Sequence, residues 1–173
     1  MNSHKIIITG PESSGKTTLC NALSKHFNLP FSKEYAREYL NALKRDYNPD
    51  DLLKIAKGQL QTENGLQLLD TDLITLKIWS QYKYGSCDNW ILTQIEKQKI
   101  ENRFYLLCST DIPWQADKQR ENPNDREELF KIYKQELDDL EHTYFIVDGE
   151  NRVENSILKI SSITSASITN SSN

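Results

Sequence analysis

The residues from Gly10 to Thr18 have the types and spacing of a phosphate-binding loop. They read GPESSGKTT, which fits the Walker A pattern G-x-x-x-x-G-K-T. The loop follows the apolar run Ile6-Ile7-Ile8 and precedes a helical pattern, so main-chain N–H groups and the positive end of a helix dipole would converge on an anion. We expect Lys16 to bridge the β- and γ-phosphates of a nucleotide and the Thr17 hydroxyl to ligate Mg²⁺. The residues of this loop expected to contact nucleotide are Gly10, Glu12, Ser13, Ser14, Gly15, Lys16, Thr17 and Thr18. The alternative is a Gly-Ser turn that leads into a helix.

Acidic residues follow two further predicted strands. Glu34 comes after the second, and Asp70 and Asp72 come after the third. Ligands of open α/β sheets bind outside the carboxyl ends of the strands, so these acids are expected to face the phosphate loop. Asp70 is the candidate for organising Mg²⁺, Glu34 is the preferred general base, and Asp72 is a second candidate for the base and a substrate contact. The alternatives are helix caps for Asp70 and Asp72 and a first-turn acid beside a helix dipole for Glu34.

The polar segment 111–126 is predicted to be a lid that closes over the nucleotide and excludes water. It carries Arg120 and Arg126, which we expect to neutralise charge during phosphoryl transfer, with Arg120 also contacting the nucleotide. The alternative is a solvated polar loop. The region after Gly149, including Arg152, is the expected neighbour of adenine.

Four aromatic side chains are expected along the same rim: Tyr35, Tyr39, Trp79 and Trp114. A planar substrate ring could stack on one of them, and Trp114, in a loop after a proline, is the preferred candidate. The alternative for each is packing in the core or at a hinge.

The elements that must position these residues alternate between strand and helix, which predicts an α/β fold with three layers. Strands are expected over residues 5–9, 30–33, 66–70, 104–108 and 144–147, forming a five-stranded parallel sheet with helices on both faces. Asn48 and Pro49 are expected to begin one helix, Gly85 to end another, and the sequence Asn124–Glu127 to form a capping box. One domain over residues 1–163 and a polar, flexible tail over 164–173 are predicted.

The composition narrows the class of protein. At 173 residues, 27% charged and 37% hydrophobic, the chain is expected to be one soluble domain. A formal net charge of −4 argues against a general nucleic-acid binder, and no apolar run is long enough to cross a bilayer. The three cysteines form no C-x-x-C pair and there is no leader pattern, so we expect a cytoplasmic protein with reduced thiols. No N-K-x-D guanine signature and no Cys/His spacing for zinc occurs.

Taken in order, these motifs resemble the ribosylnicotinamide kinase domain of NadR-type bacterial proteins of NAD biosynthesis, and more broadly the AAA-like P-loop kinases. The matching segments are GPESSGKTT, EYAREYL (34–40), DLLKIAKGQ (51–59), LLDTDLIT (68–75) and PWQAD followed by Arg120. The likeness runs from about residue 5 to residue 163.

The resemblance implies a P-loop kinase fold, with ATP and Mg²⁺ as donor and the ribose 5′-hydroxyl of nicotinamide riboside as acceptor. By motif position it carries roles onto Lys16, Thr17, Glu34, Arg37, Asp70, Asp72, Trp114 and Arg120, with Tyr35 added as a substrate contact. Members of the family carry an adenylyltransferase domain upstream and often a DNA-binding domain. Since this chain begins at the kinase segment, neither activity is expected. Lys118 also replaces a glycine that the family has in its PWxADGxR segment.

The main hypothesis is therefore a small ATP-dependent kinase whose partners are ATP and a nucleoside, with nicotinamide riboside as the expected acceptor. A second hypothesis keeps the chemistry and changes the acceptor to another nucleoside, a vitamin alcohol or a nucleotide. A third is an ATP-binding regulator with little turnover. Transfer is favoured over the third by the acidic rim and the arginine-bearing lid. The sequence leaves the oligomeric state open.

Overall fold

A computed structural model describes residues 4–169 of the chain, with side chains over residues 4–165. Five parallel strands form one sheet in the order β2-β3-β1-β4-β5. The strands are β1 (Lys5–Thr9), β2 (Phe31–Ser32), β3 (Leu68–Asp70), β4 (Arg103–Cys108) and β5 (Thr143–Val147). The helices are α1 (Lys16–Phe27), α2 (Tyr35–Ala42), α3 (Pro49–Thr62), α4 (Leu73–Tyr84), α5 (Asn89–Gln98), α6 (Arg126–Asp139) and α7 (Arg152–Thr169). The predicted five-stranded parallel sheet is confirmed.

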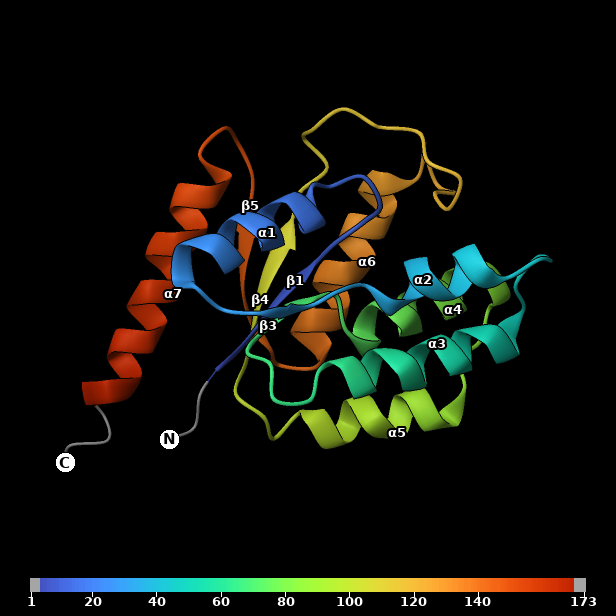
Figure 1. Cartoon of the computed structure of the whole chain (residues 1–173), viewed down its shortest axis with the longest axis horizontal. Coiled ribbons are helices and arrows are strands. Elements are labelled where there is room, and N and C mark those ends of the chain that lie inside the picture. Colours follow the sequence, from blue (N-terminus) through green and yellow to red (C-terminus); the bar gives the residue numbers. More distant parts are fainter. Residues whose placement is uncertain (1–3, 170–173) are drawn as a thin grey trace.

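The sheet is covered on both faces, as Figure 1 shows. Side chains alternate between the two faces of a strand. Ile6 and Ile8 of β1 therefore pack with α1 and α7, whereas Ile7 faces the opposite layer built from α2 to α6. All three isoleucines are at most 5% exposed. Such continuous apolar strands are typical of a parallel sheet buried on both faces. The three-layer prediction is confirmed.

The register of the strands brings chemistry to one edge of the sheet. Ile8 of β1 pairs with Asp70 at the end of β3 and with Leu106 of β4. The loops that leave β1, β2, β3 and β4 consequently meet at the same edge, where parallel strands have their carboxyl ends. These loops carry the phosphate loop, Glu34, Asp70 and the predicted lid.

Several helix ends have the predicted chemistry. The Asn48 side chain accepts from the Asp51 N–H at 3.1 Å, and the Asp51 carboxylate accepts from the Asn48 N–H at 3.0 Å, which completes a capping box before Pro49. Gly85 ends α4 in the left-handed region at φ 72°.

Two predictions about helix ends are wrong. Asp125 precedes α6 without a side-chain hydrogen bond to the helix, because its backbone lies at φ −105° and ψ 9° instead of in the extended region that a capping side chain needs. Helix α7 continues to Thr169 and so runs into the segment 164–173 that was predicted to be a flexible tail, because the Ser/Thr-rich sequence contains no proline or glycine to stop it. The rest of the predicted tail, residues 170–173, lies outside the described residues. None of the helices in the described part of the chain combines the length and apolar character needed to cross a membrane.

Candidate active site

A cleft of about 460 Å³ opens at the carboxyl edge of the sheet. Its base is the phosphate loop, its walls are α2, α4 and α6, and the segment 112–122 crosses above it. The residues that line it are Gly10 to Thr18, Glu34, Ala36, Arg37, Leu40, Thr75, Ile78, Trp79, Tyr82, Lys83, Ile112, Gln115, Gln119 to Asn122, Leu129 and Tyr133. Every phosphate-loop residue predicted to contact nucleotide, and Arg120, therefore lies on this cleft.

The geometry of the phosphate loop depends on its first glycine. Gly10 has φ 132°, and a Cβ at this position would lie 2.7 Å from the Cys108 carbonyl oxygen. That distance is too short for any side chain, so the loop can run directly against β4 only with glycine here. The Lys16 ammonium donates to the carbonyls of Gly10 at 2.9 Å and Pro11 at 2.7 Å. The loop thus holds its lysine at the bottom of the cleft.

Thr17 and Asp70 form the predicted metal-binding corner. The Thr17 hydroxyl donates to Asp70 Oδ2 at 2.7 Å, while Asp70 Oδ1 is buried without a partner among the described residues. Burial raises the pKa of Asp70 to about 6, and the nearby Glu34 charge acts in the same direction, against the hydrogen bond from Thr17. A hydroxyl and a carboxylate oxygen with a free lone pair suit Mg²⁺.

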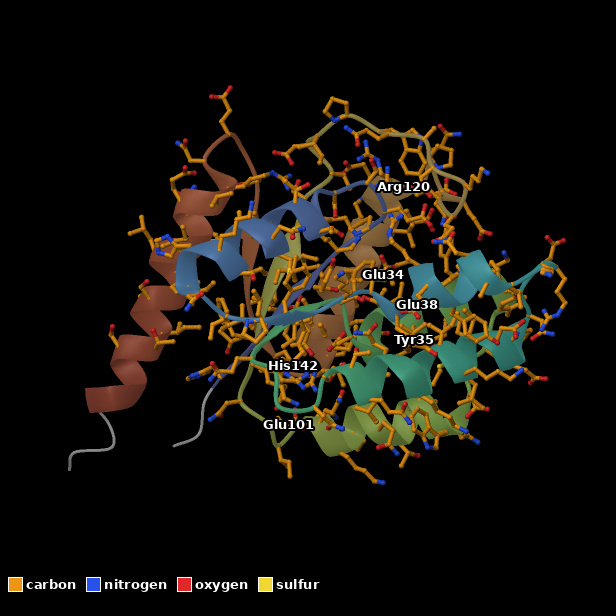
Figure 2. All side chains as sticks on the ribbon, viewed as in Figure 1. Glu34, Tyr35, Glu38, Glu101, Arg120 and His142 are labelled. Carbon is orange, nitrogen blue, oxygen red and sulfur yellow. The ribbon has the colours of Figure 1, made fainter. Side chains whose placement is uncertain are left out.

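Glu34 lies on the cleft at the start of α2, where its backbone is still extended. Its carboxylate is 3.4 Å from Arg37 Nε, one turn along the helix. Arg37 also reaches Asp117 of the segment above the cleft, at 3.3 Å. Figure 2 shows Glu34 at the start of α2, below Arg120 in this view. The structure therefore brings Glu34, Arg37 and Arg120 to the cleft that holds the phosphate loop.

The segment 111–125, which we call the lid, is docked on the phosphate loop. Glu12 accepts from the N–H groups of Glu121 at 2.9 Å and Asn122 at 3.1 Å. The Ser13 hydroxyl accepts from the Gln115 N–H at 2.9 Å and from Arg120 at 3.4 Å. Arg120 also donates to the Gln115 carbonyl. The lid thus carries an arginine to the phosphate loop.

Arg126 also contacts the phosphate loop, through a main-chain carbonyl. It donates to the carbonyls of Ser13 at 3.1 Å and Ile112 at 3.0 Å, and its guanidinium lies 5.7 Å from the centroid of the Trp114 ring. Neither Arg126 nor Trp114 lines the cleft. The prediction that Trp114 stacks on substrate does not fit this placement, because the Trp114 ring packs against Arg126 at the start of α6.

Tyr35 and Tyr39 also lie away from the cleft. The Tyr35 ring packs against Gly58 of α3, where a Cβ would lie 2.1 Å from a ring carbon. The Tyr39 hydroxyl donates to Asp51 at 2.8 Å. Both rings join α2 to α3, so the prediction of Tyr35 as a substrate contact is not supported by its position. Of the four predicted aromatics, Trp79 alone lines the cleft.

Asp72 is the clearest correction to the predicted site. Its side chain is fully buried, caps α4 through the Ile74 N–H at 3.1 Å, and accepts from Arg103 at 3.1 Å and the Tyr105 hydroxyl at 2.7 Å. These contacts hold the carboxylate in the core between the sheet and the layer of α2 to α6, and Asp72 does not line the cleft. The cap that was the alternative interpretation is therefore observed, and Asp72 has no access to a substrate proton.

The buried cluster around Arg103 gives a pH-dependent prediction. Glu63 accepts from Arg103 at 3.0 Å, and burial raises its pKa to about 7, with the Asp72 charge adding to the rise and Arg103 opposing it. Because the folded state binds this proton more tightly than the unfolded chain, the stability it contributes is complete below about pH 4.5 and is lost as the pH rises through about 7. Urea unfolding measures the free energy of unfolding of Glu63→Gln and of wild type at each pH. The difference, variant minus wild type, should rise by up to about 3 kcal/mol from pH 5 to pH 8. An equal pH dependence in the two proteins would contradict this assignment.

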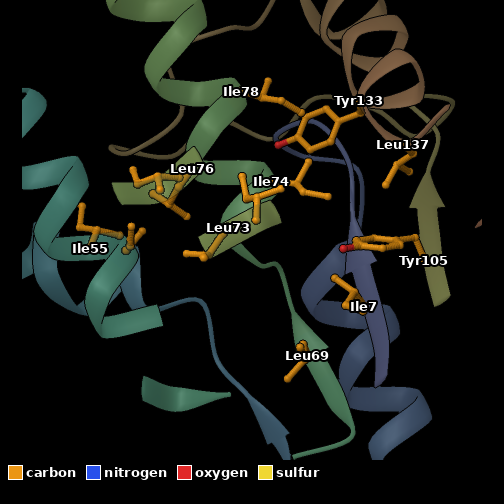
Figure 3. Packing of buried hydrophobic residues seen from close by; sticks show 14 of the residues in the cluster. Ile7, Ile55, Leu69, Leu73, Ile74, Leu76, Ile78, Tyr105, Tyr133 and Leu137 are labelled. Atoms are coloured by element: carbon orange, nitrogen blue, oxygen red, sulfur yellow. The ribbon is translucent and has the colours of Figure 1, made fainter. Parts of the chain in front are cut away.

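The wall opposite the phosphate loop is mostly aromatic and apolar. Of its residues, Trp79 alone was predicted from the sequence. Thr75, Ile78, Trp79 and Tyr82 line the cleft from one face of α4. Tyr133 from α6 packs in the same cluster as Ile78, as Figure 3 shows, and burial raises the pKa of its hydroxyl above its usual range. The four residues of α4 are spaced i, i+3, i+4 and i+7, which places them on one face of the helix. This periodic pattern is visible in the sequence.

Arg152 joins the start of α7 to the phosphate loop. It donates to the carbonyls of Ser14 at 2.9 Å and Ser109 at 3.1 Å, and it pairs with Asp111. The region after Gly149 therefore borders the phosphate loop, as the prediction for an adenine neighbour requires, and contact with adenine remains a prediction.

Comparison with known proteins agrees with this geometry. The chain is 27% identical over 161 residues to the trifunctional NAD biosynthesis/regulator protein NadR of Escherichia coli (strain K12), which covers 84% of this chain and 38% of that protein. A crystal structure of NadR protein in complex with NR superposes with a TM-score of 0.66 at 25% identity, over 87% of this chain and 45% of that chain. The chain thus spans less than half the length of these relatives. The predicted likeness to NadR is confirmed.

A second solved structure shares the fold over nearly its whole length. Deoxyadenosine kinase from M. mycoides, in a structure with dCMP and dCDP, superposes with a TM-score of 0.61 at 20% identity, over 91% of this chain and 99% of that chain. At this identity the likeness shows the P-loop kinase fold alone. The family comparison matches residues 5–154, which is most of the chain. The protein belongs to the AAA domain family, with the P-loop kinase fold that NadR shares.

Proposed function

We propose that this protein is an ATP-dependent nucleoside kinase that phosphorylates the ribose 5′-hydroxyl of nicotinamide riboside to give nicotinamide mononucleotide. The observation that carries the proposal is the cleft itself, in which a phosphate loop with Lys16 lies opposite Glu34 and an aromatic wall. The likeness to NadR, one structure of which contains NR, supports the choice of acceptor.

Different residues of the cleft have different roles in phosphoryl transfer. The loop amides and Lys16 hold the triphosphate, and the aromatic wall of α4 and α6 holds the nucleoside ring. Glu34 accepts the proton of the attacking hydroxyl, which leaves the oxygen free to attack the γ-phosphate. Arg120, brought by the lid, neutralises charge on the transferring group. Since the lid already contacts the phosphate loop, it also excludes water that would otherwise hydrolyse ATP.

The Thr17–Asp70 corner fits a magnesium ion because Asp70 keeps one buried oxygen without a partner. Mg²⁺ would bind with the Thr17 hydroxyl and the Asp70 carboxylate and would offset the negative charge of the β- and γ-phosphates. Replacing Asp70 with asparagine should raise the Mg²⁺ concentration needed for half-maximal turnover about 10- to 100-fold. A magnesium titration at saturating ATP measures this, with Asp88→Asn, at an exposed aspartate outside the cleft, as the control for the same change of side chain. An unchanged magnesium requirement would remove Asp70 from the site.

The acceptor is tested by comparing compounds. ADP release should be stimulated most strongly by nicotinamide riboside, less by purine or pyrimidine nucleosides, and least by vitamin alcohols, and the product should carry the new phosphate on the 5′-oxygen. A stronger response to another nucleoside would keep the kinase and change the acceptor. ATP binding with no stimulated release by any compound would favour the regulatory alternative.

A further inference from the structure

The lid is joined near Glu121 to the wall of the cleft formed by Thr75, Ile78, Trp79 and Tyr82 of α4, which we call the acceptor wall. The residue that joins them does not line the cleft. Tyr47 lies in the connection between α2 and α3. Its hydroxyl donates to Glu121 Oε2 of the lid at 2.7 Å and accepts from Trp79 Nε1 at 2.9 Å. One phenolic oxygen therefore joins the lid to a ring that faces the expected acceptor.

The surroundings hold Tyr47 in this position. Its ring lies edge-on to Trp79, with centroids 5.1 Å apart, and its carbonyl accepts from the Tyr84 hydroxyl at 3.0 Å. The Lys83 ammonium lies 3.9 Å from the centre of the Tyr47 ring and reaches both carboxylate oxygens of Glu121 at 2.9 Å. Burial, helped by the Glu121 carboxylate, raises the pKa of Tyr47 well above its usual range, so the hydroxyl keeps its proton and remains a donor.

The Tyr47 hydroxyl is expected to stabilise the docked lid more than the ion pair between Lys83 and Glu121 does. Lys83 and Glu121 have side chains that are 34% and 40% exposed, and exposed ion pairs contribute little stability. The Tyr47 hydroxyl donates to the Glu121 carboxylate and accepts from Trp79 Nε1 and from the Lys83 ammonium, the latter at 2.5 Å. Hydrogen bonds to charged groups contribute more than neutral ones.

Glu121 directly follows Arg120, and its N–H donates to Glu12 of the phosphate loop. The same short lid segment therefore contacts the phosphate loop through its main chain and the acceptor wall through the Glu121 carboxylate. We infer that Tyr47 is a positioning residue that couples the place of Trp79 in the acceptor wall to closure of the lid and so to the placement of Arg120. An acceptor that seats Trp79 correctly favours the closed lid, which makes this linkage a determinant of acceptor specificity. The inference rests on the proposed function for the identity of the acceptor side.

The first test needs no activity. Lys118 and Arg120 are trypsin sites within the lid. In Tyr47→Phe, which keeps the ring and loses the hydroxyl, trypsin should cut the lid about fivefold faster than in wild type. Trp79→Phe, which loses the N–H donor, should also speed cleavage. The controls are Tyr144→Phe, which loses a similar hydroxyl-to-carboxylate bond of 2.9 Å to Asp138 away from the lid, and Trp90→Phe on α5, which lies outside the cleft.

The second test separates positioning from general damage. With ATP and nicotinamide riboside, Tyr47→Phe should lower kcat for transfer about fivefold and raise the share of ATP lost to hydrolysis, while the Kd for ATP stays unchanged. Glu121→Gln should give a similar loss, and the double variant should be no worse than the worse single variant, because both remove one linkage.

Lid cleavage at the wild-type rate in Tyr47→Phe, or single losses that multiply in the double variant, would overturn the inference. If wild-type protein transfers no phosphate to nicotinamide riboside, the proposed acceptor fails, and the trypsin result still decides whether Tyr47 and Trp79 hold the lid. If transfer occurs but the lid of Tyr47→Phe is protected as in wild type, the inference alone fails.

Discussion

Lys16→Ala should abolish phosphoryl transfer, lowering kcat/KM by about a thousandfold or more, because Lys16 is the cation held within the phosphate loop itself. Among the described residues, the other cations that line the cleft, Arg37, Lys83 and Arg120, come from α2, α4 and the lid. The Lys16 ammonium lies 2.9 Å and 2.7 Å from two loop carbonyls, so it is already directed at the centre of the phosphate loop. A coupled assay of ADP release measures the effect.

Lys131→Ala is the matched control for Lys16, since Lys131 is an exposed lysine on α6 outside the cleft. It should retain wild-type turnover. A Lys16→Ala enzyme within tenfold of wild type would mean that the phosphate loop does not hold the reacting phosphates.

Glu34→Gln should lower kcat by a factor of about 10² to 10⁴, the range in which general bases contribute, while the Kd for ATP changes little. The Glu34 carboxylate lines the cleft at the start of α2. The amide of glutamine is similar in shape but cannot accept the proton. The pair that Glu34 makes with Arg37 is partly exposed, so its loss costs little by itself. Pre-steady-state measurement of the transfer step, together with ATP binding by calorimetry, separates the two effects.

Glu38→Gln is the control for Glu34. Glu38 lies one turn further along α2, as Figure 2 shows, and does not line the cleft. The control should behave as wild type. If Glu34→Gln turned over as fast as Glu38→Gln, another group would have to take the proton.

The parts of the fold that depend on local sequence were predictable. The run Ile6-Ile7-Ile8 is apolar at every position, as a strand buried on both faces must be, and the glycine-bounded loop directly after it fixed where the site would lie. Placing Asp70 beside Thr17 needed only the rule that the carboxyl ends of parallel strands share an edge, and the structure joins the two at 2.7 Å.

The parts that depend on distant partners were not predictable. Asp72 looks like Asp70 in sequence, but Arg103, 31 positions later, and Tyr105 hold its carboxylate in the buried core. The hydrogen bond that Trp79 Nε1 donates goes to Tyr47, 32 positions away. By contrast, the stripe of Thr75, Ile78, Trp79 and Tyr82 is local and periodic, and could have been predicted as a wall of the site once the site was placed.

The most direct test of the proposed function is to incubate the purified protein with ATP, Mg²⁺ and nicotinamide riboside and to follow the products by phosphorus NMR. If the proposed function is right, a new phosphomonoester should appear on the ribose 5′-oxygen, in equal amount with ADP, and Lys16→Ala should give no such product. ADP accumulating with inorganic phosphate and no phosphomonoester would contradict it.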